Sequence, residues 1–197
     1  MKTLKSLAIA AAILATAANS RAALFTYNVT LNGATEIPSN FSPGFGFGTV
    51  TIDNVTNTMT SFVNFQTLTG ITISAALFGA TAAPFTGSAG LASNNFTTFP
   101  VGVNFGVASG TLNMTQTSSY DPGFLAANGG TAASAFAALK SFADSGRTYI
   151  DIKTSTFPAG EIRGYLTPVP EPTSACLVAI GAGMGLMRRR RSAARNV

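Results

Sequence analysis

Apolar and polar side chains alternate along most of the chain. In residues 25–31, FTYNVTL, every second position is Phe, Tyr, Val or Leu, and Thr or Asn stands between them. This period of two is typical of a β-strand with one buried face. The same pattern predicts strands at residues 48–53, 58–68, 71–79, 101–114 with a break near Gly110, 148–153 and 161–166. About seven or eight short strands predict a mainly β fold, a single antiparallel β-sandwich or barrel-like domain.

A helical period replaces this alternation in residues 131–146, TAASAFAALKSFADSG. The apolar side chains recur there at three- and four-residue spacing, as in an amphipathic helix. They are Phe136, Leu139 and Phe142 or Ala143. Gly146 is placed to end the helix. The sequence therefore predicts one short helix within the β domain.

Three stretches carry turn and loop signals instead of a clear period. Residues 80–100 and 117–130 are small, polar and rich in Gly, so we expect loops there. The run GFGFG at residues 44–48 lacks the spacing of a nucleotide-binding glycine motif. It predicts a flexible hairpin or an edge turn.

The charges are unevenly distributed along the chain. The formal net charge is +5, but most of the basic residues lie in the first 21 and the last ten positions. Between residues 22 and 187 the basic side chains are Lys140, Arg147, Lys153 and Arg163, and the acidic ones are Glu36, Asp53, Asp121, Asp144, Asp151, Glu161 and Glu171. Four bases against seven acids leave this body at −3. Because nucleic-acid binding needs clustered Lys and Arg, we expect no nucleic-acid partner.

The N-terminus has the layout of a secretory signal peptide. Lys2 and Lys5 precede an apolar run at residues 7–18, and small residues follow. We assign residues 1–22 to this peptide, with cleavage before Ala23 or before Arg21. An uncleaved anchor is the alternative, although the apolar run is shorter than the ~20 residues of a membrane span.

The C-terminus combines three signals in residues 169–197. Pro170, Glu171 and Pro172 come first, residues 173–187 are uncharged and mostly apolar, and Arg188, Arg189, Arg190 and Arg191 follow. As a helix the apolar run reaches about 22 Å, a short span against a hydrocarbon core of roughly 30 Å. The arginines hold this end in the cytoplasm by the positive-inside rule.

This ending resembles the PEP-CTERM sorting signal of Gram-negative bacteria. The resemblance implies cleavage by an exosortase-type membrane protease, after signal peptidase has acted at the other end. It also implies transient anchoring in the inner membrane, followed by a cell-surface or extracellular location. A permanent C-terminal anchor and a GPI signal are the alternatives, although the apolar tail of a GPI signal normally ends the chain.

Two motifs at the edges of residues 23–168 resemble the CHRD domain, a module common in exported bacterial proteins. They are LNGATEIP at residues 31–38 and YIDIKTSTFPAGEIRGYL at residues 149–166. Members of that family usually carry a His-x-His pair on a middle strand and a histidine before the Thr matching Thr154. Here the middle strand reads ISAALFGA at residues 73–80, and Lys153 precedes Thr154. The resemblance implies protein or matrix binding more than catalysis.

The residue composition limits the catalytic and metal-binding chemistry that the chain can perform. The chain has no histidine and one cysteine, Cys176, so Ser-His-Asp and Cys-His catalysis and the usual zinc sites lack their side chains. We therefore expect no enzyme, no metal and no cofactor. The sequence favours an exported cell-surface or extracellular-matrix module with a structural, adhesive or binding role, for which extracellular polysaccharide and surface proteins are candidate partners. The alternative is a weakly acidic, carboxylate-dependent hydrolase acting on extracellular polymers.

Asp151, Lys153, Glu161 and Arg163 form the densest charge cluster of the body. An antiparallel hairpin of residues 148–153 and 161–166 predicts the facing pairs Lys153–Glu161, Asp151–Arg163 and Tyr149–Tyr165. In this register the isoleucines point to the core and the charges lie on the exposed face. We therefore predict that the four charges specify strand pairing, with catalysis as the alternative.

Overall fold

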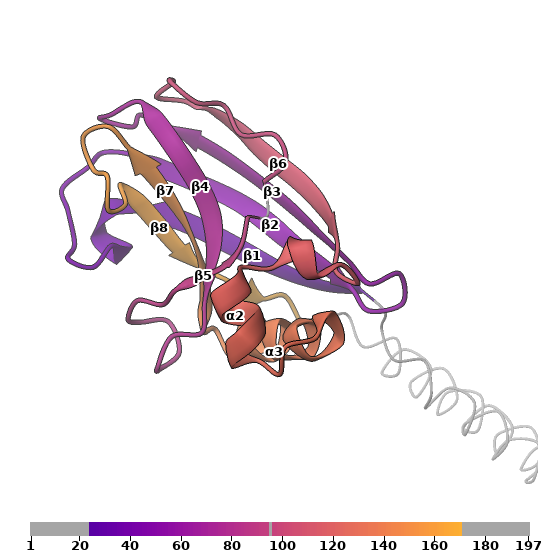
Figure 1. Ribbon diagram of the computed structural model, residues 1–197. Helices are drawn as coiled ribbons and strands as arrows, with labels where there is room; N and C mark the ends of the chain where they lie inside the picture. Colours follow the sequence, from indigo (N-terminus) through magenta and orange to yellow (C-terminus); the bar gives the residue numbers. More distant parts are fainter. Residues whose placement is uncertain (1–23, 95, 171–197) are drawn as a thin grey trace, which may run out of the picture. The chain divides into compact units, whose positions relative to one another are not determined.

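The computed structural model describes residues 24–94 and 96–170 (Figure 1). The predicted signal peptide lies outside the described residues, as do Glu171, Pro172 and Arg188–Arg191 of the predicted sorting segment. Pro170 is the last described residue and is exposed to solvent. In the two described ranges, no helix is both long enough and apolar enough to cross a membrane.

Strands are the main regular elements of the described chain, and two helices lie late in the sequence. The strands are β1 (Leu24–Asn32), β2 (Phe45–Asp53), β3 (Thr58–Gln66), β4 (Thr72–Gly79), β5 (Leu91–Ser93), β6 (Gly106–Asn113), β7 (Thr148–Thr154), β8 (Ile162–Tyr165) and β9 (Thr167–Pro168). The helices are α2 (Pro122–Ala127) and α3 (Ala132–Asp144), and η1 (Gly33–Thr35) and η2 (Thr117–Ser119) are 3-10 turns. The mainly β fold is the one predicted.

All of these strands belong to one antiparallel sheet. Its order is β5-β4-β7-β8-β1-β2-β3-β6, and β9 pairs with β1. The sheet is curled into a half-barrel, so that β4, β7 and β8 cross at an angle to β1, β2 and β3 (Figure 1). The barrel-like alternative of the predicted fold is therefore the observed one.

The segment before β6 connects the two ends of the curled sheet. Thr98 forms an isolated bridge with Ser109 of β6. At the other end of the sheet, Thr72 of β4 donates its N–H to the carbonyl of Val103 and accepts from the N–H of Gly102. These bonds tie the edge of β6 to the start of β4 and help to hold the curl.

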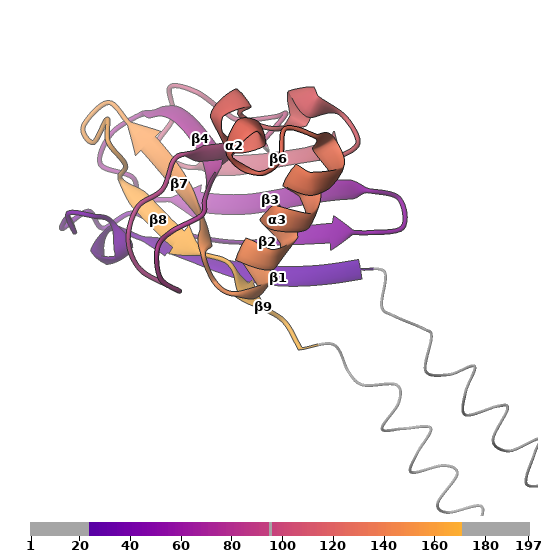
Figure 2. The same cartoon turned by 60° about the horizontal axis from the view of Figure 1, so that its bottom comes forward.

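The concave side of the sheet holds the hydrophobic core. Alternate residues of β1 point into it, namely Tyr27, Val29 and Leu31, and the neighbouring strands do the same. Helix α3 lies across β1, β2 and β3 (Figure 2) and buries Ala135, Leu139 and Ala143 against them. The period of two in the strands and the helical period of α3 thus bury one common face of each element.

Helix α3 confirms the predicted helix and shows why it begins and ends where it does. Thr131 and Ser134 form a reciprocal capping box at its N-terminus. At the other end Gly146 has a φ of 67°. A left-handed backbone at this position favours glycine, so the sequence stops the helix there.

The prediction of a flexible hairpin or an edge turn at GFGFG is wrong, because β2 already begins at Phe45. Gly46 and Gly48 lie on the inner side of this strand, in register with Phe65 and Val63 of β3. A Cβ atom added at Gly46 would lie 2.9 Å from the carbonyl oxygen of Asn64. These glycines permit close packing of backbone in a strand, instead of marking a turn.

The predicted loops also contain short elements that were missed. Residues 80–100 include the edge strand β5, and residues 117–130 include η2 and α2. Asp121 caps α2 through the N–H groups of Gly123 and Phe124, and Pro122 occupies its first turn, a signal that could have predicted this helix. The predicted break at Gly110 is also wrong, since β6 runs through it.

Candidate functional site

The two sequence motifs at the edges of the domain meet in space. Glu36 directly follows η1, and its carboxylate reaches Arg163 of β8. Asn32 at the end of β1 pairs with Arg163 in the sheet. Asn40 donates from Nδ2 to the carbonyl of Glu161 at 3.0 Å. The connection between β1 and β2 is therefore fastened to the β7–β8 hairpin.

The register of that hairpin is the predicted one. Asp151 faces Arg163, Tyr149 faces Tyr165 and Ile152 faces Ile162. The rings of the two tyrosines lie 5.5 Å apart, edge to face. Because the isoleucines belong to the hydrophobic core, a slip of one residue would put the charged side chains there instead. The pairing of Asp151 with Arg163 is thus confirmed.

The predicted exposure of these charges is wrong. Asp151 is 2 % exposed, Arg163 is 4 % exposed and Glu161 is fully buried. Residues 81–90 cover the outer face of the hairpin, where the hydroxyl of Tyr165 donates to the carbonyl of Gly87 at 2.7 Å. Alternation along a strand shows which face a residue is on, but it does not show whether a loop covers that face.

Arg163 binds two carboxylates with one nitrogen. Its Nη2 atom lies 2.9 Å from Oε2 of Glu36 and 3.1 Å from Oδ2 of Asp151. Nη1 donates to Oγ of Ser88 at 3.0 Å. The guanidinium also lies 4.2 Å from the ring centroid of Tyr149, in cation–π geometry. Arg163 thereby joins η1, β7, β8 and the covering loop.

Two buried carboxylates share this single guanidinium, and both have raised pKa values. Burial raises the pKa of Glu36 to about 7, with the charge of Asp151 adding to the rise and Arg163 opposing it. Burial likewise raises the pKa of Asp151 to about 6, against the lowering effects of Arg163 and Lys153. Within the described part of the chain, Oε1 of Glu36 and Oδ1 of Asp151 are buried without hydrogen-bond partners. A proton on either acid relieves this surplus of negative charge.

Glu161 does not pair with Lys153, contrary to the prediction. Its carboxylate accepts hydrogen bonds from the hydroxyls of Ser42 and Thr154 and from the N–H groups of Thr69 and Gly70. Burial acts to raise the pKa of Glu161, but these hydrogen bonds outweigh it and lower the pKa. Glu161 stands just before β8, and its side chain bonds to two loops and to Thr154 at the end of β7 instead of pairing with Lys153.

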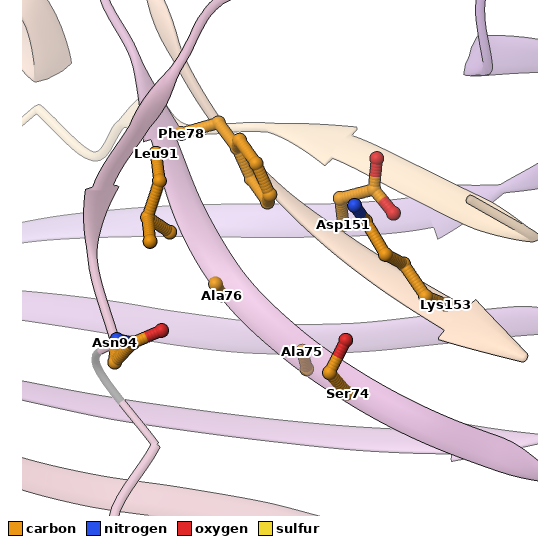
Figure 3. Close-up of a pocket in the computed structure, with 8 residues that line it drawn as sticks. All are labelled: Ser74, Ala75, Ala76, Phe78, Leu91, Asn94, Asp151 and Lys153. Carbon is orange, nitrogen blue, oxygen red and sulfur yellow. The ribbon is translucent and has the colours of Figure 1, made fainter. Parts of the chain in front are cut away.

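Lys153 borders a small pocket on the outer side of β4 and β7 (Figure 3). The pocket has a volume of about 220 Å³ and is lined by Ser74, Ala75, Ala76, Phe78, Leu91, Asn94, Asp151 and Lys153. The ring of Phe78 stacks on Tyr149 at 5.3 Å. Nζ of Lys153 lies 5.5 Å from the centroid of Phe78. Asp151 is the single acid among the lining residues.

The positions that carry histidines in the resembled family lie beside this pocket. The middle strand of residues 73–80 corresponds to β4, and Ser74 of this strand pairs with Lys153. Serine, alanine and lysine cannot supply the imidazole ligands expected there. Among the described residues, no group of three His, Cys, Asp or Glu side chains is placed to hold a metal ion.

The remaining described acids have local structural partners. Asp53 accepts from the N–H groups of Val55 and Thr56 in the β2–β3 turn. Asp144 accepts from the hydroxyl of Tyr27 at 2.7 Å, and its other oxygen lies 2.7 Å from Nζ of Lys140. With Asp121 at the α2 cap, each of these acids stabilises a turn, a helix end or a packing contact.

A second feature escaped the sequence analysis, an exposed surface on the convex side of β1, β2, β3 and β6. We call it the open face and define it by the outward side chains of these four strands. Its large apolar members are Phe47 (53 % exposed), Leu24 (52 %), Val107 (46 %), Phe45 (44 %) and Phe62 (43 %). Phe45 and Phe47 alternate with inward-facing glycines, a pattern in GFGFG that signals an outward aromatic row.

The curled antiparallel sheet, with a capping helix pair and loops fastened by a buried ionic anchor, defines a small β module. The family model of the CHRD domain matches residues 27–166, and the chain belongs to this family. That membership indicates an extracellular or binding module. No curated protein and no solved structure matches the chain.

Proposed function

We propose that the chain is an exported, non-enzymatic module of the cell surface or extracellular matrix, with a structural, adhesive or binding role. Membership of the CHRD family supports the extracellular setting. The signal-peptide pattern of residues 1–22 and the PEP-CTERM-like ending of residues 169–197 supply the two export signals. Signal peptidase and an exosortase-type protease act on them in turn, and the membrane holds the chain between the two steps.

The non-enzymatic part of the proposal rests on the hydrogen bonds and ion pairs that the acidic side chains already make within the domain. Glu161 is surrounded by four donors, and Glu36 and Asp151 share Arg163. Hydrolysis of glycosides by carboxylates uses a pair of them flanking the scissile bond in an accessible site. The pocket of Figure 3 offers one carboxylate, that of Asp151, which is 2 % exposed. This arrangement supports binding over catalysis.

A carboxylate-dependent hydrolase is the second candidate function. The observation that favours it is the raised pKa of Asp151 beside the pocket, since a carboxyl with a raised pKa can act as a general acid. Incubation of the exported protein with extracellular polymers, followed by measurement of new reducing ends, separates the two candidates. We expect the wild-type protein to produce no more new reducing ends than an Asp151→Asn variant does. Activity that this variant loses would establish the hydrolase.

Mass spectrometry of the secreted and membrane fractions tests the export part. We expect the external protein to begin near Ala23 and to lack Arg188–Arg191. External protein that still carries these arginines would contradict the sorting proposal. Glu171→Ala should impair processing and leave the folding of the domain unchanged, because Glu171 lies beyond β9.

A further inference from the structure

The three phenylalanines of the open face lie on neighbouring strands. Phe45 and Phe47 stand two residues apart on β2, and Phe62 lies diagonally from Phe47 on β3, since Phe47 pairs with Asn64. Such diagonal neighbours are about 7 to 8 Å apart. Among the described residues none of the three rings packs against another aromatic ring, in contrast to Phe78 and Tyr149. They form a spread, solvent-exposed row instead of a closed cluster.

Polar, uncharged side chains fill the positions between these rings. Phe62 of β3 pairs with Thr49 of β2 on one side and with Ser109 of β6 on the other. The hydroxyls of Thr60 and Thr111 lie 3.1 Å apart across β3 and β6. Hydroxyls and amides both donate and accept hydrogen bonds. The open face therefore alternates apolar rings with groups suited to sugar hydroxyls.

The open face carries almost no charge. Along β1, β2, β3 and β6 the outward side chains include a single charged one, Asp53, which ends β2 and accepts hydrogen bonds from the N–H groups of Val55 and Thr56. The basic residues that an anionic polymer requires are missing from these four strands. The outward side chains of these strands also include none of the Trp, Tyr and Arg residues that dominate the hot spots of protein interfaces. A neutral partner rich in hydroxyls fits this composition best.

We propose that the open face binds an uncharged polysaccharide chain. Phe45, Phe47 and Phe62 pack against the apolar faces of sugar rings, and the threonine and asparagine side chains around them hydrogen-bond to sugar hydroxyls. No described element covers these strands on their convex side, and α3 lies on the concave side (Figure 2). This inference rests on the proposed function, because it names the class of partner that the surface module binds.

Affinity electrophoresis of the exported protein tests this inference. Native gels contain hydroxyethylcellulose, dextran or galactomannan as neutral probes, and alginate as the anionic probe. We expect retardation by at least one neutral polysaccharide and not by alginate. A Phe47→Ala/Phe62→Ala double variant should bind that polysaccharide about tenfold more weakly. Thr49→Val, which removes a hydroxyl and keeps the shape, should weaken binding by a smaller factor.

Phe41→Ala is the matched control, since Phe41 is fully exposed but lies in the segment before β2. It should bind like the wild type, and the thermal midpoints of all variants should agree. No retardation by any neutral probe, equal retardation of the double variant, or retardation by alginate alone would overturn the inference. A dimer that dissociates in the double variant would assign the open face to a second copy instead. New reducing ends in the same incubations would overturn the non-enzymatic proposal and leave the binding result standing.

Discussion

The two parts of the curled sheet use their outer faces in opposite ways. On β7 and β8 the outward side chains include Asp151 and Arg163, and residues 81–90 cover them so completely that both are buried. On β2 and β3 the outward side chains include Phe47 and Phe62, and these stay in solvent. Charge is thus inside and apolar surface outside, the reverse of the usual arrangement. The difference indicates that the charged part fixes the fold and the apolar part meets a partner.

The largest expected effect is on the covered part, from Arg163→Met. This change removes the one cation shared by Glu36 and Asp151 and leaves both carboxylates buried. We expect the free energy of unfolding to fall by about 3 to 5 kcal/mol, measured by urea denaturation at neutral pH. Lys140→Met, which breaks the exposed pair with Asp144, should cost about 0.5 kcal/mol or less. Equal losses in the two variants would show that the covered charges do not hold the fold.

Glu161→Ala should have the next largest effect. It leaves the N–H groups of Thr69 and Gly70 and two hydroxyls without their acceptor. We expect a loss of about 2 to 4 kcal/mol in the same urea experiment. Glu161→Gln keeps one acceptor oxygen and should lose less. A value within 0.5 kcal/mol of the wild type for Glu161→Ala, as is usual for surface changes, would contradict the anchoring role.

The dependence of stability on pH should reflect Glu36 and Asp151, the two buried acids that share the guanidinium of Arg163. Because the pKa values of Glu36 and Asp151 are raised to about 7 and about 6, the folded state binds more protons than the unfolded state between these values and the ordinary ones. The thermal midpoint should therefore rise as the pH falls from about 8 to about 5. Below that, the lowered pKa of Glu161 makes stability fall again, as its carboxylate becomes protonated.

Glu36→Gln should reduce this rise between pH 8 and 5 to the part that Asp151 contributes, because the amide cannot titrate. Asp53→Asn is the matched control, since hydrogen bonds from Thr56 and Val55 lower the pKa of this exposed acid. The control should leave the same range unchanged. A wild-type thermal midpoint that falls steadily from pH 8 to 5 would contradict the raised pKa values of Glu36 and Asp151.

The smallest effect on stability should come from the open face. Phe47→Ala should change the free energy of unfolding by about 0.5 kcal/mol or less, because the ring is 53 % exposed. Phe65→Ala, which empties a buried site on β3, should cost about 3 to 5 kcal/mol. A large loss at Phe47 would mean that the open face serves folding, which would remove the contrast between the two parts.

The sequence predicted the strands well where one face alone is buried. The alternation in β1 and the facing isoleucines of β7 and β8 determine face and register, because a slip would bury charge. It could not predict that residues 81–90 cover the hairpin, since that contact joins segments far apart in the chain. Three of the four donors around Glu161, those of Ser42, Thr69 and Gly70, likewise come from loops far away in the sequence. GFGFG was misassigned because glycine marks both turns and close strand packing.

One experiment compares the covered β7–β8 hairpin with the open face. The ¹⁵N-labelled exported protein is titrated with the neutral polysaccharide that retards it most, and its amide signals are followed by nuclear magnetic resonance. We expect amide shifts to concentrate in β2, β3 and β6, around Phe47 and Phe62. The β7–β8 hairpin and the pocket at Ser74 and Lys153 should stay unshifted. Shifts confined to that pocket, with β2 and β3 silent, would contradict the division between a covered part that holds the fold and an open part that binds.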